Sequence, residues 1–176
     1  CVVSTIVVTG LSGVGKTTAT RLAAEAGYLT VSVGDLFEKS TLVKDGIDDE
    51  FNTRIHTERG DDYFIRLAIE RLYQRHDVDE HVGVVIDSIQ TVAARRAVSS
   101  ALGPIKIVWI HSPVADRVQR LRQRDVNPLA RRALLQRDLR ELNYGLASFA
   151  TPFGHDVCVA NDTTLEAFTR DIRAVL

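Results

Sequence analysis

The sequence is poor in sulfur-containing residues: it has no methionine and only two cysteines, Cys1 and Cys158, among its 176 residues. Two cysteines cannot build the disulfide framework of a small secreted domain, and their spacing is not that of a metal site. We therefore expect a reducing, cytoplasmic location. Because the first residue is a cysteine, an initiator residue at least is missing before Cys1, and we expect little structure to have been lost with it.

The sequence also lacks long apolar runs. None approaches the roughly 18 residues of a membrane span, and no charged leader precedes a signal-like core, so no membrane partner is expected. The formal net charge is only −1, which gives no global field to recruit nucleic acid. With 45% hydrophobic and 26% charged residues, the composition is that of a globular protein, and a chain of this length most simply forms one domain over 1–176.

Lysine is scarce as well: the 22 basic residues are four lysines and eighteen arginines. The planar guanidinium offers a fork of donors that suits phosphate, so the skew suggests an anionic ligand. Genome-driven arginine usage explains the count equally well. Only the positions of the arginines can decide between the two.

Short apolar runs alternate along the chain with segments of helical periodicity. The runs are continuous and rich in β-branched residues, which is typical of strands buried in a parallel sheet. We expect strands at 5–9, 28–33, 82–87, 105–110 and 155–160, with helices between them that include 61–75 and 91–101. Near the end, Leu135, Leu139 and Leu142 mark the apolar face of another helix. This alternation predicts an α/β fold with a doubly wound parallel sheet.

One loop carries the strongest signal. The stretch GLSGVGKTT follows the first expected strand and opens a helix, which is the context that a phosphate-binding loop requires. Its glycines let backbone N–H groups turn inward around phosphate oxygens, and the helix N-terminus adds its dipole. We assign nucleotide binding to Gly10, Ser12, Gly13, Val14, Gly15, Lys16, Thr17 and Thr18. Lys16 reaches the β- and γ-oxygens as a catalytic residue, and the Thr17 hydroxyl ligates Mg²⁺. A glycine-rich turn that only packs tightly would not explain the adjacent Lys-Thr.

Two aspartates follow expected strands. Asp87 ends the run VVID, where the carboxyl end of a strand lies beside the phosphate-binding loop, and we assign it to the Mg²⁺ site; the alternative is the N-cap of the next helix. Asp35 comes just after the second strand. It is a candidate general base for the acceptor, and a helix cap is an equal alternative on spacing alone.

The arginines concentrate in one region, with eight of the eighteen between residues 117 and 140. Arg117, Arg120 and Arg124 share one helix face by their spacing, and Asn127-Pro128 breaks that helix. Such a helix–loop–helix can close over phosphates. We assign catalytic roles to Arg120, Arg124, Arg137 and Arg140, although a solvated basic surface explains several of the eight.

These motifs, taken in order, resemble those of the P-loop kinases of the adenylate kinase and dephospho-CoA kinase group, and most of all its small, uncharacterised kinase-like members. The resemblance rests on VVTGLSGVGKTT, VSVGDLF, VVIDSI, DRVQRLRQRD, RDLRELNYG and VANDTTLEAF, and it covers nearly the whole chain. It implies a P-loop NTPase three-layer sandwich with a five-stranded parallel sheet. It further implies an acceptor-binding helical segment at about 36–76, an arginine-rich helical lid at about 120–140, and a nucleotide that contacts Arg120 and Asn161.

The chain departs from this family in two places. Members that phosphorylate nucleoside monophosphates usually carry an arginine shortly after the Gly-Asp turn, where this sequence has Glu38 and Lys39. They also usually have Asp-Gly followed by an arginine, where this sequence has Ser88 and Gln90. Both changes tilt the prediction toward a hydroxyl acceptor, whose proton Asp35 would remove, or toward an unusual nucleotide acceptor.

The prediction is an ATP- and Mg²⁺-dependent phosphotransferase that moves the γ-phosphate of ATP to a nucleotide-like small molecule. Two alternatives stay open: an NTP-binding regulatory switch or ATPase, and a kinase acting on a modified base within nucleic acid. The near-zero net charge disfavours nucleic acid as a partner, and the arginine-rich lid leaves it open.

Overall fold

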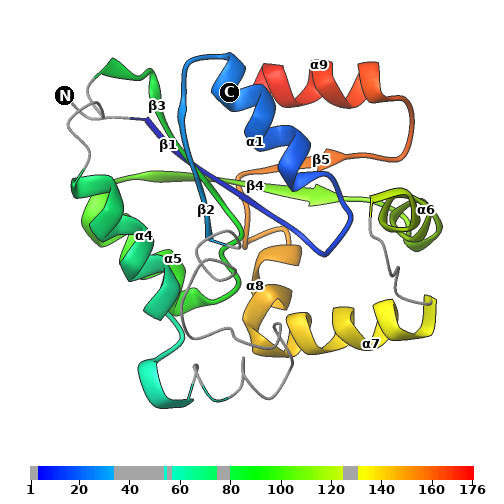
Figure 1. Cartoon of the computed structure of the whole chain (residues 1–176), viewed down its shortest axis with the longest axis horizontal. Helices are drawn as coiled ribbons and strands as arrows, with labels where there is room; N and C mark the ends of the chain where they lie inside the picture. Colours follow the sequence, from blue (N-terminus) through cyan, green and yellow to red (C-terminus); the bar gives the residue numbers. More distant parts are fainter. Residues whose placement is uncertain (1–3, 34–53, 55–56, 75–79, 125–130) are drawn as a thin grey trace.

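The computed structural model describes residues 4–33, 54, 57–74, 80–124 and 131–176. Its centre is one parallel sheet of five strands in the order β2-β3-β1-β4-β5 (Figure 1). The strands are β1 (Ser4–Thr9), β2 (Leu29–Ser32), β3 (Gly83–Asp87), β4 (Ile105–His111) and β5 (Val157–Ala160). Each of the five lies within its expected segment to within one or two residues, and every pairing between neighbours is parallel. The predicted α/β fold with a five-stranded parallel sheet is confirmed.

Helices cover both faces of this sheet, which makes three layers (Figure 1). One face carries α1 (Lys16–Glu25) and α9 (Leu165–Val175); the other carries α4 (Tyr63–Tyr73), α5 (Val92–Leu102) and α8 (Ala147–Ala150). Side chains of β4 alternate between the two cores: Ile107 and Trp109 pack toward α4 and α5, whereas Val108 and Ile110 pack toward α1 and α9. Because both faces are covered, the strands are apolar throughout, as their continuous apolar runs indicate.

The central strand β1 positions the loop that follows it. Ile6, Val7 and Val8 are each 2% exposed or less, with Val7 in one core and its two neighbours in the other. In the register of the sheet, Val8 lies opposite Asp87 of β3. The carboxyl ends of β1 and β3 therefore meet at one edge, where ligands bind in open α/β sheets.

Two helices, α6 (Val114–Arg124) and α7 (Arg131–Glu141), extend beyond the sheet and share a small apolar cluster of Val118, Leu121 and Leu134. The prediction that Leu135 and Leu139 lie on the buried face of α7 is wrong. Leu135 and Leu139 are 39% and 61% exposed, whereas Leu134 and Asp138 are buried. The face of α7 that turns inward is the one that carries Asp138, because this residue forms a buried ion pair with Arg117.

Side-chain caps define where two helices begin. The Thr91 hydroxyl accepts a hydrogen bond from the Ala94 N–H (3.0 Å) at the start of α5. The Thr164 hydroxyl accepts from the Ala167 N–H (3.2 Å) at the start of α9. In that first turn, a backbone hydrogen bond and then a side-chain hydrogen bond with Thr164 lower the pKa of Glu166. No helix in the described part of the chain is both long and apolar enough to cross a bilayer.

Candidate functional site

The loop from Gly10 to Gly15 joins β1 to α1 at the centre of the sheet. Gly13 and Gly15 adopt φ values of 81° and 110°, in the left-handed region that favours glycine. A Cβ on Gly15 would lie 2.6 Å from Nδ2 of Asn161, and one on Gly13 would lie 3.2 Å from the Arg117 backbone oxygen. The loop is thus enclosed tightly from outside by α6 and by the chain after β5. The structure thus shows the tight packing of this loop, and its binding of phosphate stays a prediction.

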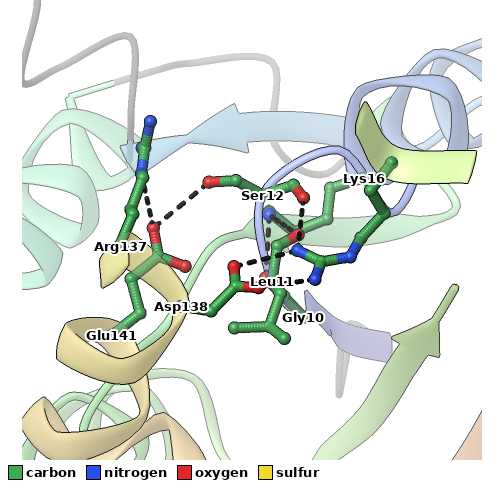
Figure 2. A network of polar contacts seen from close by, with 8 residues as sticks. Gly10, Leu11, Ser12, Lys16, Arg137, Asp138 and Glu141 are labelled. Carbon is green, nitrogen blue, oxygen red and sulfur yellow. Dashed lines mark hydrogen bonds and ion pairs between the residues drawn. The ribbon is translucent and has the colours of Figure 1, made fainter. Parts of the chain in front are cut away.

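Lys16, the first residue of α1, folds back over the loop. Its Nζ donates hydrogen bonds to the carbonyl oxygens of Gly10 (2.8 Å) and Leu11 (3.1 Å) (Figure 2). The ammonium group therefore lies against the carbonyl groups at the start of the loop. Thr17 next to it is exposed, and Thr18 is half-buried. The side chain of Val14 is 1% exposed and belongs to the apolar core, so Val14 can offer a ligand only its backbone.

Asp87 ends β3 beside this loop and is 7% exposed. Its carboxylate accepts a hydrogen bond from the Ser88 hydroxyl. The alternative that Asp87 caps the next helix is wrong, because Thr91 caps α5. Ser88 has a φ of 72°, in the left-handed region, which costs a residue with a Cβ about 1 kcal/mol.

Arg120 and Asn161 meet on the other side of the loop. Nδ2 of Asn161 donates to the Val14 carbonyl (2.8 Å), and Nη2 of Arg120 donates to the Asn161 backbone oxygen (2.9 Å) and to its side-chain oxygen (3.2 Å). Nη1 of Arg120 donates to the Ser112 hydroxyl (2.8 Å), which itself donates to the Asn161 backbone oxygen. Both predicted nucleotide contacts thus brace the loop, and their contact with a nucleotide stays a prediction.

Arg117 has a structural role that the sequence pattern of residues 117–140 did not predict. Its side chain is 2% exposed and forms a two-point ion pair with Asp138 of α7, with Nη1 to Oδ1 at 2.9 Å and Nη2 to Oδ2 at 2.5 Å. Nη1 also donates to the Ser12 carbonyl at 3.0 Å. One guanidinium therefore joins α6, α7 and the loop. The available signal was Asp138 itself, one of only two acids in the arginine-rich window.

The four predicted lid arginines have different environments. Arg120 packs against the loop, and Arg137 lies on α7, where its Nε donates to Glu141 (2.9 Å). Arg140 of α7 is half-buried. Arg124 ends α6, and its side chain is not described. Two other predicted parts of the site also lie outside the described residues: residues 125–130 of the lid and the candidate base Asp35. Arg120 thus contacts the loop directly, whereas Arg137 is linked to it through Glu141, which also accepts a hydrogen bond from the Ser12 hydroxyl.

The site residues fit a nucleotide-bound metal better than a metal held by protein alone. Among the residues that the structure describes, no three His, Cys, Asp or Glu side chains form a metal-binding group. Mg²⁺ in phosphate-transfer sites usually takes one or two protein ligands and completes its shell with phosphate oxygens and water. An exposed Thr17 hydroxyl and a carboxylate at the neighbouring strand end match that small donor set.

Because the Arg117–Asp138 pair is buried, replacing Asp138 should destabilise the protein much more than replacing an exposed aspartate. Asp138→Asn leaves the buried Arg117 charge without a counterion, so the free energy of unfolding should fall by about 3 kcal/mol or more. Asp171→Asn, which breaks the exposed pair with Arg170, should change it by less than about 0.5 kcal/mol. Urea unfolding of both variants measures this difference, and equal small effects would contradict a structural role for the Arg117–Asp138 pair.

The packing of the loop also predicts how much stability a Gly→Ala substitution costs at two glycines with nearly the same φ. Gly13 (81°) is within 3.2 Å of α6 atoms at its Cβ position, whereas Gly103 (84°) has nothing within 4 Å. Gly103 has a ψ of −154°, a conformation that is reached almost only by glycine, so Gly103→Ala should cost a backbone strain of about 1–3 kcal/mol and no steric term. Gly13→Ala should cost roughly 1–3 kcal/mol more, because α6 must shift away from the loop. Equal losses in denaturant unfolding would mean that α6 does not press on the loop.

Known proteins match this chain along most of its length. A family model described as an AAA domain matches residues 6–141. A UPF0200 protein from Pyrobaculum aerophilum is 32% identical over 178 residues, which cover 99% of this chain and 97% of that protein. A UPF0200 protein from Thermococcus onnurineus is 27% identical and covers 97% and 95% of the two chains.

Two solved structures share the fold. A gluconokinase from Sinorhizobium meliloti superposes with a TM-score of 0.62 at 20% identity, over 98% of this chain and 91% of that one. A shikimate kinase from Bacteroides thetaiotaomicron superposes with a TM-score of 0.58 at 16% identity, over 98% and 96%. At these identities the likeness is one of fold alone: a five-stranded parallel sheet covered by helices on both faces. By its family match and its full-length similarity, the chain belongs to the AAA domain family and to the UPF0200 proteins.

Proposed function

We propose that the protein is an ATP- and Mg²⁺-dependent phosphotransferase that moves the γ-phosphate of ATP to a hydroxyl group of a nucleotide-like small molecule. The observation that carries the proposal is the arrangement at the centre of the sheet. Lys16 lies over the loop that opens α1, and the buried Asp87 carboxylate ends the neighbouring strand. The predicted relation to the adenylate kinase and dephospho-CoA kinase group and the cytoplasmic location belong to the same proposal.

The donor phosphates bind in the loop. Backbone N–H groups of residues 13–18 and the N-terminal dipole of α1 attract the phosphate oxygens. Lys16 exchanges its two carbonyl partners for β- and γ-oxygens, which are stronger acceptors because they are charged. Thr17 and Asp87 would hold Mg²⁺, which when bound neutralises part of the phosphate charge.

The acceptor approaches from the carboxyl end of β2. In the transfer, the bond between the γ-phosphorus and the bridging β,γ-oxygen breaks, a bond from the acceptor oxygen to that phosphorus forms, and ADP leaves. The acceptor proton passes to Asp35. A hydroxyl acceptor is supported by the absence of arginine at Glu38, Lys39 and Gln90. It is also supported by the likeness in fold to a gluconokinase and a shikimate kinase, since gluconate and shikimate offer hydroxyl groups.

The arginines act on the transferring group. Negative charge on the equatorial oxygens of the phosphoryl group must be stabilised as the old bond stretches, and a well-placed guanidinium contributes about 10³–10⁵ in rate. We assign this role to Arg137, with Arg124 and Arg140, and the contact with the nucleotide to Arg120 and Asn161. Closure of the segment 120–140 would exclude water and so suppress hydrolysis of ATP.

Lys16→Ala tests the donor site. The substitution should lower acceptor-dependent ADP formation by at least about 10²-fold, because it removes a charged donor to the phosphate oxygens. The melting temperature should stay close to that of the wild type, since the side chain is only partly buried. The assay supplies ATP and Mg²⁺ with a panel of nucleosides, nucleotides and hydroxy acids. Wild-type turnover in the variant would contradict the nucleotide site.

The same panel separates the proposed activity from its alternatives. ADP formation that does not depend on any acceptor would favour an ATPase or a regulatory switch. Phosphate transfer only to oligonucleotides would favour a kinase acting on a base within nucleic acid.

Asp35→Asn tests the acceptor chemistry. If Asp35 removes the proton of a hydroxyl, the substitution keeps the shape of the side chain but removes its basicity, and kcat should fall by roughly 10²–10⁴-fold. With a phosphate acceptor the nucleophile is already anionic, so mainly the acceptor KM should rise. A helix cap would instead lower stability by about 1 kcal/mol with kcat unchanged. Steady-state kinetics and thermal unfolding of this variant distinguish the three, and an unchanged kcat would remove Asp35 from the mechanism.

A further inference from the structure

The contact between the phosphate-binding loop and the end of α7 carries a role that the proposed function does not yet include. Glu141, the last residue of α7, accepts two hydrogen bonds at the same carboxylate oxygen (Figure 2). One comes from the Ser12 hydroxyl of the loop (3.2 Å) and the other from Nε of Arg137 (2.9 Å). The Glu141 side chain is only 12% exposed. We propose that Glu141 is a positioning residue that holds the Arg137 guanidinium at the phosphate-binding loop, a role that rests on the proposed function.

The way in which Arg137 is held leaves its terminal nitrogens available. The ion pair uses Nε, and within the described residues Arg137 forms no further hydrogen bond or ion pair. Its side chain is 49% exposed. A guanidinium that is fixed through Nε keeps four N–H donors on its two Nη atoms. Two of them, side by side, match the oxygens of a phosphoryl group.

A carboxylate beside a phosphate site is unfavourable by itself. Glu141 would repel the phosphate oxygens, since like charges at a few ångströms cost free energy even near a protein surface. The pairing with Arg137 cancels that charge, and the Ser12 hydroxyl ties the pair to the loop. We therefore expect that the gain from positioning the Arg137 guanidinium exceeds the cost of placing the Glu141 carboxylate near the phosphate.

The anchoring of α7 does not depend on Glu141. Asp138 lies one turn earlier on the same face of α7, and it reaches Ser12 through the buried Arg117, whose Nη1 donates to the Ser12 carbonyl. The Arg117–Asp138 pair sets the position of the helix on the loop. Glu141 adds a second, more exposed contact to the Ser12 hydroxyl, so its substitution should leave the fold intact.

The chain offers a matched control for this contact. Arg21 and Glu25 on α1 have the same i, i+4 spacing as Arg137 and Glu141, but their side chains are 59% and 47% exposed. No atom of the phosphate-binding loop forms a described hydrogen bond with either residue. Glu25 also lies 3.9 Å from the Arg173 guanidinium of α9. Glu25→Gln therefore reports what the loss of ordinary surface ion pairs away from the loop does.

The experiment measures binding of ADP and of the non-hydrolysable β,γ-imido analogue of ATP, both with Mg²⁺, by calorimetry. Glu141→Gln should raise the Kd of the analogue by about 5- to 20-fold and leave the Kd of ADP within about twofold, because only the γ-phosphate meets Arg137. Arg137→Ala should do the same. The double variant should match Arg137→Ala, since Glu141 acts through that arginine. Glu25→Gln should behave as the wild type, and all four melting temperatures should stay close to the wild-type value.

Several results would overturn the inference. They are an unchanged analogue Kd in Glu141→Gln, a double variant whose loss is the product of the two single losses, and equal losses for ADP and the analogue. Tighter analogue binding by Glu141→Gln would mean that the carboxylate only repels phosphate. The proposed function fails separately, if the wild type shows no acceptor-dependent ADP formation, because the binding measurement needs no acceptor.

Discussion

The structure around the phosphate-binding loop depends on one buried ion pair. The guanidinium of Arg117 meets the Asp138 carboxylate at two points and donates to the Ser12 carbonyl as well. A charge that is 2% exposed needs such pairing, because the cost of removing it from water is several kcal/mol. The partners occupy the two Nη atoms, whereas the buried Nε of Arg117 has no hydrogen-bond partner. Three segments that are far apart in the sequence must therefore come together: the start of α6, the end of α7 and the loop after β1.

The remaining contacts of the loop extend the same principle. Asn161 holds the Val14 carbonyl from the end of β5, and Arg120 holds Asn161. These partners take the outward-facing carbonyl groups of the loop. In the proposed function, backbone N–H groups at the start of α1 would meet the anion, and the loop would combine a rigid shape with an electropositive interior. In the proposed reaction this rigidity would serve function, because phosphoryl transfer gains mainly from positioning and from charge already in place.

The two acidic residues of α7, Asp138 and Glu141, have different roles. Asp138 is buried and structural, whereas Glu141 is partly exposed and holds an arginine whose terminal nitrogens stay available. The basic residues divide in the same way: Arg117 supports the loop from inside, and Arg137 is presented beside it. An arginine-rich helix pair thus combines a structural role with a proposed catalytic one, and residue type alone does not distinguish them.

The sequence by itself determined the strands, the loop and the fold class, because these follow from local patterns. Continuous β-branched runs mark buried parallel strands, and a glycine-rich turn followed by Lys16-Thr17 has few other uses. Only the tertiary structure decided which face of α7 is buried and which arginine is buried with it. Leu135 and Leu139 have helical spacing but face solvent, since Asp138 must reach Arg117. Likewise, Ser12 meets Glu141 across 129 residues of sequence. No local pattern encodes such a contact, because it exists only once the sheet and its helices have brought the two residues together.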